Sequence, residues 1–272
     1  MAVRVRRNCR PMTAFEVTRH QRSEGSVLLR TGHRGLIRMR EAGSAKVRFP
    51  FGGNEAILIN TSGGLAGGDQ ASFDIGVEEG AHLSVTTQAA ERVYRTLGPA
   101  ADVDVSLTAA PCSTLQWLPQ ETILFDGSAL SRRITVDLAP DARFLAVESI
   151  ILGRRAMGET VAAASLRDRW RIHRDSQLVF ADDVVFDGAP PASKAALGDA
   201  RAFATVLLVE NDAGRLLDPV REAIGDSGGV SAWSGKLVAR LVAKDGFDLR
   251  KVLIPALTVL AQGAVLPKVW SM

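Results

Sequence analysis

The sequence contains none of the motifs that mark a bound nucleotide, a tight metal site or a common hydrolase. A glycine-rich segment occupies residues 60–69, but no Gly-Lys-Ser/Thr follows it and no Gly-x-Gly-x-x-Gly register occurs, so we do not expect a nucleotide there. The four histidines are scattered, and neither His-x-x-x-His nor Cys-x-x-Cys spacing is present. A tightly held metal would therefore need ligands from distant segments or from another chain.

Cysteine, aromatic residues and long apolar runs are also scarce. Cys9 and Cys112 are the only cysteines and lie far apart, so no disulfide framework is implied. Aromatic residues make up only 6% of the chain, which argues against nucleic acid stacked on aromatic side chains. No run of about eighteen apolar residues occurs, and no apolar segment follows the basic start. We therefore expect a cytoplasmic protein that does not bind a membrane.

The charge is unevenly distributed. Although the formal net charge is only +3, residues 1–40 hold ten arginines against Glu16 and Glu24. We predict a flexible Arg-rich tail over residues 1–12 and a single domain over residues 13–272, because 46% hydrophobic content is ample for one core. The arginine cluster is either a solvated tail and edge strand or a docking surface for an acidic partner, and the sequence leaves both alternatives open.

Most of the chain has the pattern of short strands separated by turns. Apolar and polar side chains alternate, or apolar residues run together, at residues 57–59, 103–107, 134–138, 170–174 and 204–209. This pattern predicts a mainly β fold, a single strand-rich domain of stacked-sheet, solenoid-like or sandwich form. Two or three helices are expected toward the C-terminus.

Three segments near the C-terminus have helical patterns. From residue 249 to 260 apolar side chains recur along one side, with Asp248 as the predicted N-cap, Gly263 as the stop and Pro255 as a kink. Asp218 and Pro219 predict a short helix that ends near residue 224. A third helix is predicted over residues 191–198.

Carboxylates and hydroxyls supply the candidate chemistry. Glu148 interrupts the apolar run 144–152, so its side chain must be paired, hydrogen-bonded or facing a wet cavity, and Arg154 and Arg155 lie nearby in sequence as possible partners. A structural ion pair is the simpler alternative. Residues 86–95 gather hydroxyl, amide and carboxylate groups, which indicates either a strand end or a polar patch whose oxygens suit divalent cations.

Seven blocks in order resemble the family of the urease accessory protein UreD, called UreH in some bacteria. They are Gly-Gly-Leu-Ala-Gly-Gly-Asp at 63–69, Thr-Thr-Gln-Ala-Ala-Glu-Arg-Val-Tyr-Arg at 86–95, Trp-Leu-Pro-Gln-Glu-Thr-Ile-Leu-Phe-Asp-Gly at 117–127, Leu-Gly-Arg-Arg-Ala-Met-Gly-Glu at 152–159, Arg-Asp-Arg-Trp-Arg at 167–171, Ser-Ala-Trp-Ser-Gly-Lys at 231–236 and Leu-Pro-Lys-Val-Trp at 266–270. The resemblance covers roughly residues 13–272. Lys268 stands where arginine is common in the family.

The resemblance implies a nickel-insertion chaperone rather than an enzyme. Such a protein would bind urease apoprotein, UreF and the GTPase UreG, and would conduct nickel transiently through a hydrated passage without a tightly bound cofactor. The residues carried over as candidates for this passage are Asp69, Thr86, Thr87, Glu91, Glu121, Asp126, Glu148 and Glu159. The helix after residue 248 is the candidate dock for UreF.

An alternative from another functional class remains at this stage. Paired carboxylates such as Glu121 and Asp126 on a strand-rich body are also compatible with a carbohydrate-active or hydrolytic enzyme. A carbohydrate site usually presents several aromatic platforms, whereas this chain has one tyrosine and four scattered tryptophans.

Overall fold

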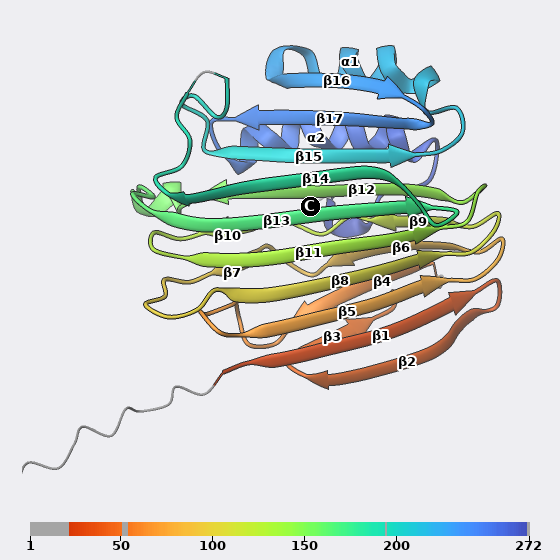
Figure 1. Ribbon diagram of the computed structural model, residues 1–272, viewed down its shortest axis with the longest axis horizontal. Coiled ribbons are helices and arrows are strands. Elements are labelled where there is room, and N and C mark those ends of the chain that lie inside the picture. Colours follow the sequence, from red (N-terminus) through yellow and green to blue (C-terminus); the bar gives the residue numbers. More distant parts are fainter. Residues whose placement is uncertain (1–21, 51–53, 194, 271–272) are drawn as a thin grey trace, which may run out of the picture.

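Two stacked β-sheets form the body of the protein, whose computed structural model describes residues 22–50, 54–193 and 195–270 (Figure 1). The tail predicted at residues 1–12 lies outside the described residues. The seven-stranded sheet has the order β14 (Gln177–Gly188), β13 (Ala164–Arg174), β11 (Ala129–Leu138), β8 (Ala101–Ala109), β5 (Gln70–Val77), β1 (Glu24–Gly32), β2 (Gly35–Gly43). The mainly β prediction is thus confirmed.

The second sheet has ten strands. Its main path is β16 (Gly228–Trp233), β17 (Lys236–Ala243), β15 (Ala202–Val209), β12 (Arg143–Leu152), β9 (Thr114–Trp117), β6 (His82–Thr87), β4 (Glu55–Asn60), β3 (Ala45–Arg48). Two short strands, β7 (Glu91–Val93) and β10 (Thr122–Leu124), pair beside β12.

The chain coils between the two sheets. From β4 to β13 the longer strands fall alternately in one sheet and the other, and neighbours within each sheet pair in parallel, as in β5–β8–β11–β13 and β4–β6–β9–β12. Strands that follow one another in sequence therefore face each other across the core. Of the stacked-sheet, solenoid-like and sandwich forms that the succession of short strands left open, the structure has stacked sheets with a solenoid-like course of the chain.

In the part of the chain that the structure describes, apolar side chains form three buried clusters. The largest lies between the sheets and includes Ile75, Leu107, Phe144 and Trp170. A smaller one lies farther along the same inter-sheet space, around Leu124, Leu130, Ile150 and Leu166. The third lies on the outer face of the ten-stranded sheet, where Leu145, Leu208 and Leu257 pack with the helices. Because β12 is covered on both faces, nearly all of its residues are buried.

Helices α1 (Leu217–Ile224) and α2 (Gly246–Ala261) lie at the end of the stack opposite β2 (Figure 1). Four 3₁₀ turns complete the elements of the described residues: η1 (Arg155–Met157), η2 (Ala213–Leu216), η3 (Gly225–Ser227) and η4 (Lys268–Trp270). Among the described residues, no helix has the length and apolar character needed to cross a bilayer.

Two of the three predicted helices form. Helix α2 contains Pro255, but its N-cap is Asp245, whose side chain accepts a 2.9 Å hydrogen bond from the Asp248 amide. Asp248 was therefore the wrong cap, because a capping residue lies outside the helix with extended backbone, as Asp245 does. The helix ends at a left-handed Gln262, one residue before the predicted stop.

The helix predicted over residues 191–198 is wrong. The described residues 195–199 form turns, in which the amides of Ala196 and Gly198 both donate to the Ser193 carbonyl. So short a segment gains little from helical hydrogen bonding without an apolar face to pack.

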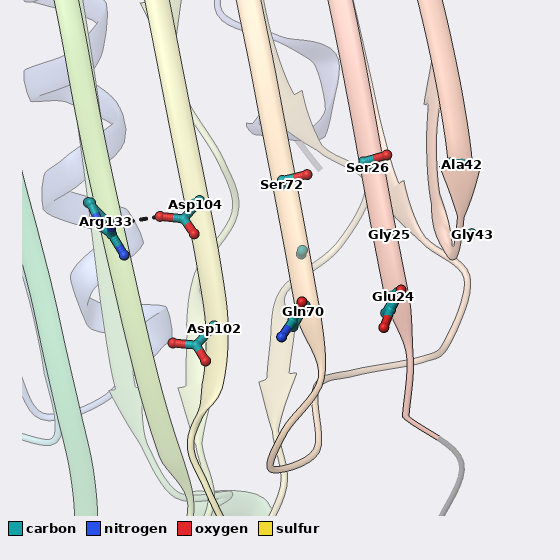
Figure 2. Close-up of a pocket in the computed structure, with 11 residues that line it drawn as sticks. Glu24, Gly25, Ser26, Ala42, Gly43, Gln70, Ser72, Asp102, Asp104 and Arg133 are labelled. Atoms are coloured by element: carbon teal, nitrogen blue, oxygen red, sulfur yellow. Dashed lines mark ion pairs between the residues drawn. The ribbon is translucent and has the colours of Figure 1, made fainter.

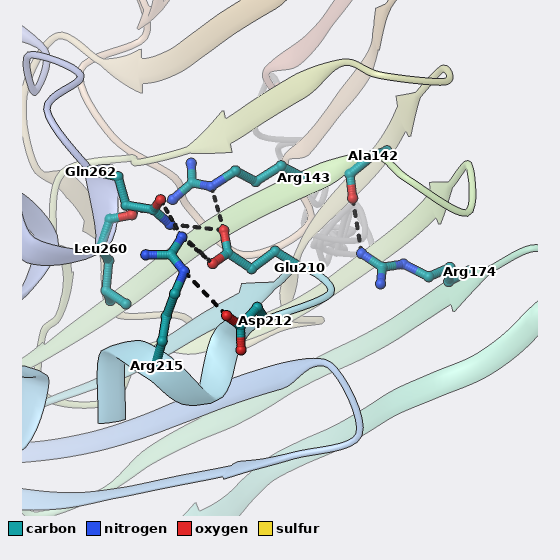
Figure 3. A network of polar contacts seen from close by, with 8 residues as sticks. All are labelled: Ala142, Arg143, Arg174, Glu210, Asp212, Arg215, Leu260 and Gln262. Carbon is teal, nitrogen blue, oxygen red and sulfur yellow. Dashed lines mark hydrogen bonds and ion pairs between the residues drawn. The ribbon is translucent and has the colours of Figure 1, made fainter. Parts of the chain in front are cut away.

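A polar network fastens the C-terminal end of α2 to the ten-stranded sheet (Figure 3). Glu210, after β15, accepts hydrogen bonds from Arg143 Nε at 2.7 Å, Arg215 Nη2 at 2.9 Å and Gln262 Nε2 at 2.8 Å. Arg143 also donates to the Leu260 carbonyl. One carboxylate thus connects β12, η2 and the helix end.

Candidate functional site

A charged cluster lies inside the inter-sheet core. Arg132 on β11 stands directly opposite Asp168 on β13 in the strand register, and its Nε and Nη2 donate to the two Asp168 oxygens at 3.0 and 2.5 Å. From the other sheet, Glu148 on β12 forms an ion pair with Arg132 Nη1. The three residues are 6%, 4% and 3% exposed, so this ion-pair triad joins the two sheets within the protein interior.

Strand alternation places the triad at a single level of the core. Arg132 falls between the inward-facing Leu130 and Ile134, because residues two apart on a strand share a face. The same spacing places Glu148 between Ala146 and Ile150 of β12. The triad therefore separates the two apolar clusters of the inter-sheet space.

The triad holds two carboxylates and only one cation. Trp117 Nε1 donates a 2.8 Å hydrogen bond to Glu148 Oε1, whereas Oε2 receives no well-aligned hydrogen bond from the described residues apart from its ion pair with Arg132. The pKa of Glu148 is raised to about 7, chiefly by burial and also by the charge of Asp168, and these causes outweigh the lowering by Arg132 and by the Trp117 hydrogen bond. Near neutral pH, Glu148 therefore exchanges between protonated and ionised forms.

A cavity of about 70 Å³ adjoins the triad and is lined by Glu148 and Arg132. Its other polar lining residues are Ser44, Asn60, Thr87, Glu91, Gln120 and Thr122. Glu91 is held there by Asn60 Nδ2, which lies 3.1 and 3.2 Å from its two oxygens. Burial raises the pKa of Glu91, although hydrogen bonds from Asn60 and the Arg92 amide lower it.

Three of the predicted path residues, Thr87, Glu91 and Glu148, line this cavity. Glu121 is buried next to it and pairs with Arg250 of α2 at 3.1 Å. Thr86 is on the opposite face of β6, where its hydroxyl donates to the Leu118 carbonyl at 2.7 Å. Adjacent strand residues point to opposite faces, so Thr86 and Thr87 do not share one passage.

The remaining predicted residues lie elsewhere and bind backbone or surface groups. Asp69 accepts hydrogen bonds from the amides of Ser23 and Ala66 at 2.8 and 2.7 Å, and so fastens the glycine-rich loop to the start of β1. Asp126 accepts from the Ala162 amide at 2.8 Å. Glu159 pairs with Arg154 at 2.8 Å, and that hydrogen bond holds the pKa of Glu159 below its usual value.

The predicted cation partner of Glu148 was wrong. Arg154 and Arg155 are at the surface, where they pair with Glu159 and Asp245. The cation that pairs with Glu148 is Arg132, which is farther away in sequence. The sequence did carry a signal for Arg132 and Asp168, because each stands at an inward position of an alternating strand, between apolar residues two positions away on either side.

A wider depression of about 550 Å³ is open on the outer face of the seven-stranded sheet (Figure 2). It is lined by polar residues of neighbouring strands, including Glu24, Asp102 and Asp104, and Arg133 pairs with Asp104 at 3.2 Å. Both of these side chains are more than half exposed, so their charges are screened by solvent. The buried triad and its cavity are therefore the stronger candidate site.

The cavity lining offers oxygen ligands in a region of excess negative charge. Its carboxylate, hydroxyl and amide oxygens suit hard or borderline divalent cations. Within the part of the chain that the structure describes, no three His, Cys, Asp or Glu residues are grouped so as to hold a metal ion together.

Comparisons with known proteins point to one family. A family model described as UreD urease accessory protein matches residues 22–271. The protein named urease accessory protein UreD in Rhizobium leguminosarum bv. viciae is 46% identical over 271 residues, which cover 96% of this chain and 99% of that protein. The protein of the same name in Agrobacterium fabrum is 43% identical over 269 residues, covering 95% of each chain.

Proposed function

From the premise that the chain belongs to the UreD family of urease accessory proteins, and so has a role in urease maturation, we propose that it delivers nickel to apo-urease. In this role it is a chaperone that works as scaffold and conduit in a complex with UreF and the GTPase UreG. The chain itself catalyses no reaction, and the energy of GTP hydrolysis comes from UreG.

The observation that carries this proposal is the buried triad beside the inter-sheet cavity. Two carboxylates share one guanidinium there, and Glu148, which lines the cavity, has in Oε2 an atom that pairs with Arg132 but receives no well-aligned hydrogen bond from the described residues. A divalent cation that enters is attracted by the uncompensated negative charge. Because its ligands are oxygens rather than thiolates or imidazoles, it is held weakly and can move on.

The proposal includes α2 as the dock for UreF. Phe247, in its first turn, is 70% exposed, and Pro255 is exposed on the same helix. Arg250, also on α2, donates hydrogen bonds to Gln120 at 2.7 Å and to Glu121 at 3.1 Å. Gln120 lines the cavity, so these contacts connect the proposed docking helix directly with the proposed path.

Complementation of a strain that lacks this gene tests the nickel path. A Glu91→Gln/Glu148→Gln variant is expected to give markedly less urease activity than the wild type at limiting nickel and to recover as nickel is added, while still copurifying with its partners. Asp104→Asn is the matched control, since it makes the same chemical change on the outer sheet face. Full activation of urease by the double variant at limiting nickel would contradict the conduit.

A further inference from the structure

We propose that Arg132 competes with the transported cation for the Glu148 carboxylate. The Arg132 guanidinium pairs with Glu148 until a divalent ion displaces the guanidinium, and the pair forms again when the ion leaves. The inference rests on the proposed nickel path and adds a residue that keeps binding in that path weak. Arg132 is thus a positioning residue that acts through Glu148.

The contacts of Arg132 are unequal in a way that suits displacement. Two of its nitrogens, Nε and Nη2, grip both oxygens of Asp168, which is the stronger forked arrangement. Only Nη1 reaches Glu148. The same Nη1 lies 3.3 Å from the Thr122 hydroxyl, which offers a second acceptor beside the cavity. Nη1 can therefore leave Glu148 while the rest of the guanidinium stays on Asp168.

Glu148 is held independently of Arg132. Its Oε1 receives the 2.8 Å hydrogen bond from Trp117, an indole that is itself buried. This bond keeps the carboxylate in place when Nη1 moves away, so Oε2 becomes the free acceptor that an incoming cation meets. The cation must compete with a full positive charge for that oxygen, and its net affinity is lower for this reason.

A purely structural role is the alternative, since a buried ion pair can simply join two sheets. The two roles make opposite predictions for nickel affinity. If Arg132 competes with the ion, its removal tightens nickel binding. If it only supports the core, its removal leaves the affinity of the folded protein unchanged or weakens it.

The double variant Arg132→Met/Asp168→Asn separates these roles because it removes the competitor without altering the formal charge of the triad. The wild-type triad has one cation and two carboxylates, and the variant keeps only the Glu148 carboxylate, so the formal charge is −1 in both proteins. The nickel dissociation constant of the full chain, measured by equilibrium dialysis, is expected to fall about tenfold, which corresponds to the loss of one charge-assisted contact. Release into a chelator, followed by stopped flow, should slow by a similar factor.

Two further variants keep the test decisive. If the Met/Asn pair does not fold, Arg132→Met/Asp168→Leu has the same charge and fills the site with apolar side chains, a replacement that proteins often tolerate. Arg133→Met/Asp104→Asn is the matched control, because it makes the same pair of changes in an exposed ion pair between Arg133, next to Arg132 on β11, and Asp104 on β8. The control is expected to leave the nickel dissociation constant unchanged.

The outcomes distinguish this inference from the function on which it rests. If the wild type and Glu148→Gln bind nickel equally, the proposed path is wrong and the competitor with it. If Glu148→Gln weakens nickel binding but the folded Arg132 variants do not bind more tightly than wild type, only the competitor is overturned. The competitor role is supported if the Arg132 variants bind nickel more tightly and release it more slowly than the wild type, while the Arg133→Met/Asp104→Asn control does not.

Discussion

The indole of Trp117 and the carboxylate of Glu148 are joined by a 2.8 Å hydrogen bond inside the core, from neighbouring strands of the same sheet. Trp117 contributes a neutral donor, so it stabilises Glu148 without cancelling its charge. The carboxylate remains costly to ionise in this buried position, and stability should therefore depend on pH.

The free energy of unfolding should fall as the pH rises through the range in which Glu148 ionises. The pKa of its carboxyl is about 7 in the folded protein against an ordinary value of 4.5, so the folded state binds the proton more tightly than the unfolded chain. Below pH 4.5 both states are protonated, and above about pH 7 the full cost of ionisation applies. That cost is on the order of 3 kcal/mol.

Glu148→Gln isolates this effect, because glutamine keeps the shape of the side chain and cannot ionise. Denaturant unfolding of both proteins between pH 5 and pH 8, a range of about three units, should show the stability of the wild type declining relative to the variant and levelling off at the top. A difference in stability that stays constant across the range would mean that Glu148 does not ionise in the folded protein at these pH values.

Sequence periodicity was sufficient to predict where strands occur but not which strands face each other across the core. Alternation at residues 103–107, 134–138 and 170–174 correctly predicted β8, β11 and β13, because side-chain period 2 follows from the geometry of one strand. Which strand faces which depends on coiling between sheets. Glu148 consequently meets Arg132 on the opposite sheet, whereas Arg154, closer in sequence, is carried past the end of β12.

A related reason explains why only some of the predicted path residues line the inter-sheet cavity. Thr87, Glu91 and Glu148 are on elements that border the inter-sheet space. Asp69 and Asp126 are in loops, where carboxylates are well suited to accept hydrogen bonds from free backbone amides. Composition does not separate these two uses of a carboxylate, because it does not reveal whether a cavity or a loop amide lies beside it.

Substitution of Phe247 tests whether α2 is the docking helix. Phe247→Asp is expected to weaken copurification with UreF by about tenfold or more, because exposed aromatic residues are frequent anchors of interfaces. The melting temperature should change little, since the ring is 70% exposed. Deletion of the whole helix would be less informative, because its buried face, including Leu253 and Leu257, belongs to the core.

Leu178→Asp is the control for this experiment. Leu178 is 54% exposed on β14 of the other sheet, so the same type of change is made away from the helices. UreF should copurify normally with that variant. If Phe247→Asp also retains UreF at wild-type levels, the docking surface is not at the start of α2.

Glu210→Gln should loosen the end of α2 by weakening the network around the carboxylate. Glu210 is only 9% exposed and accepts from Arg143, Arg215 and Gln262, so the substitution removes the negative charge that two guanidinium groups share (Figure 3). We expect the free energy of unfolding to fall by about 2 kcal/mol, the range for hydrogen bonds to charged groups.

A nearby carboxylate provides the control for Glu210. Asp212 lies 3.9 Å from Arg215 and its side chain is 79% exposed, so Asp212→Asn should change the stability by less than about 0.5 kcal/mol. Hydrogen exchange should show faster exchange of the amides in the last turn of α2 in Glu210→Gln but not in Asp212→Asn. Equal effects of the two substitutions would mean that solvent screens both carboxylates alike and that the helix end depends on apolar packing instead.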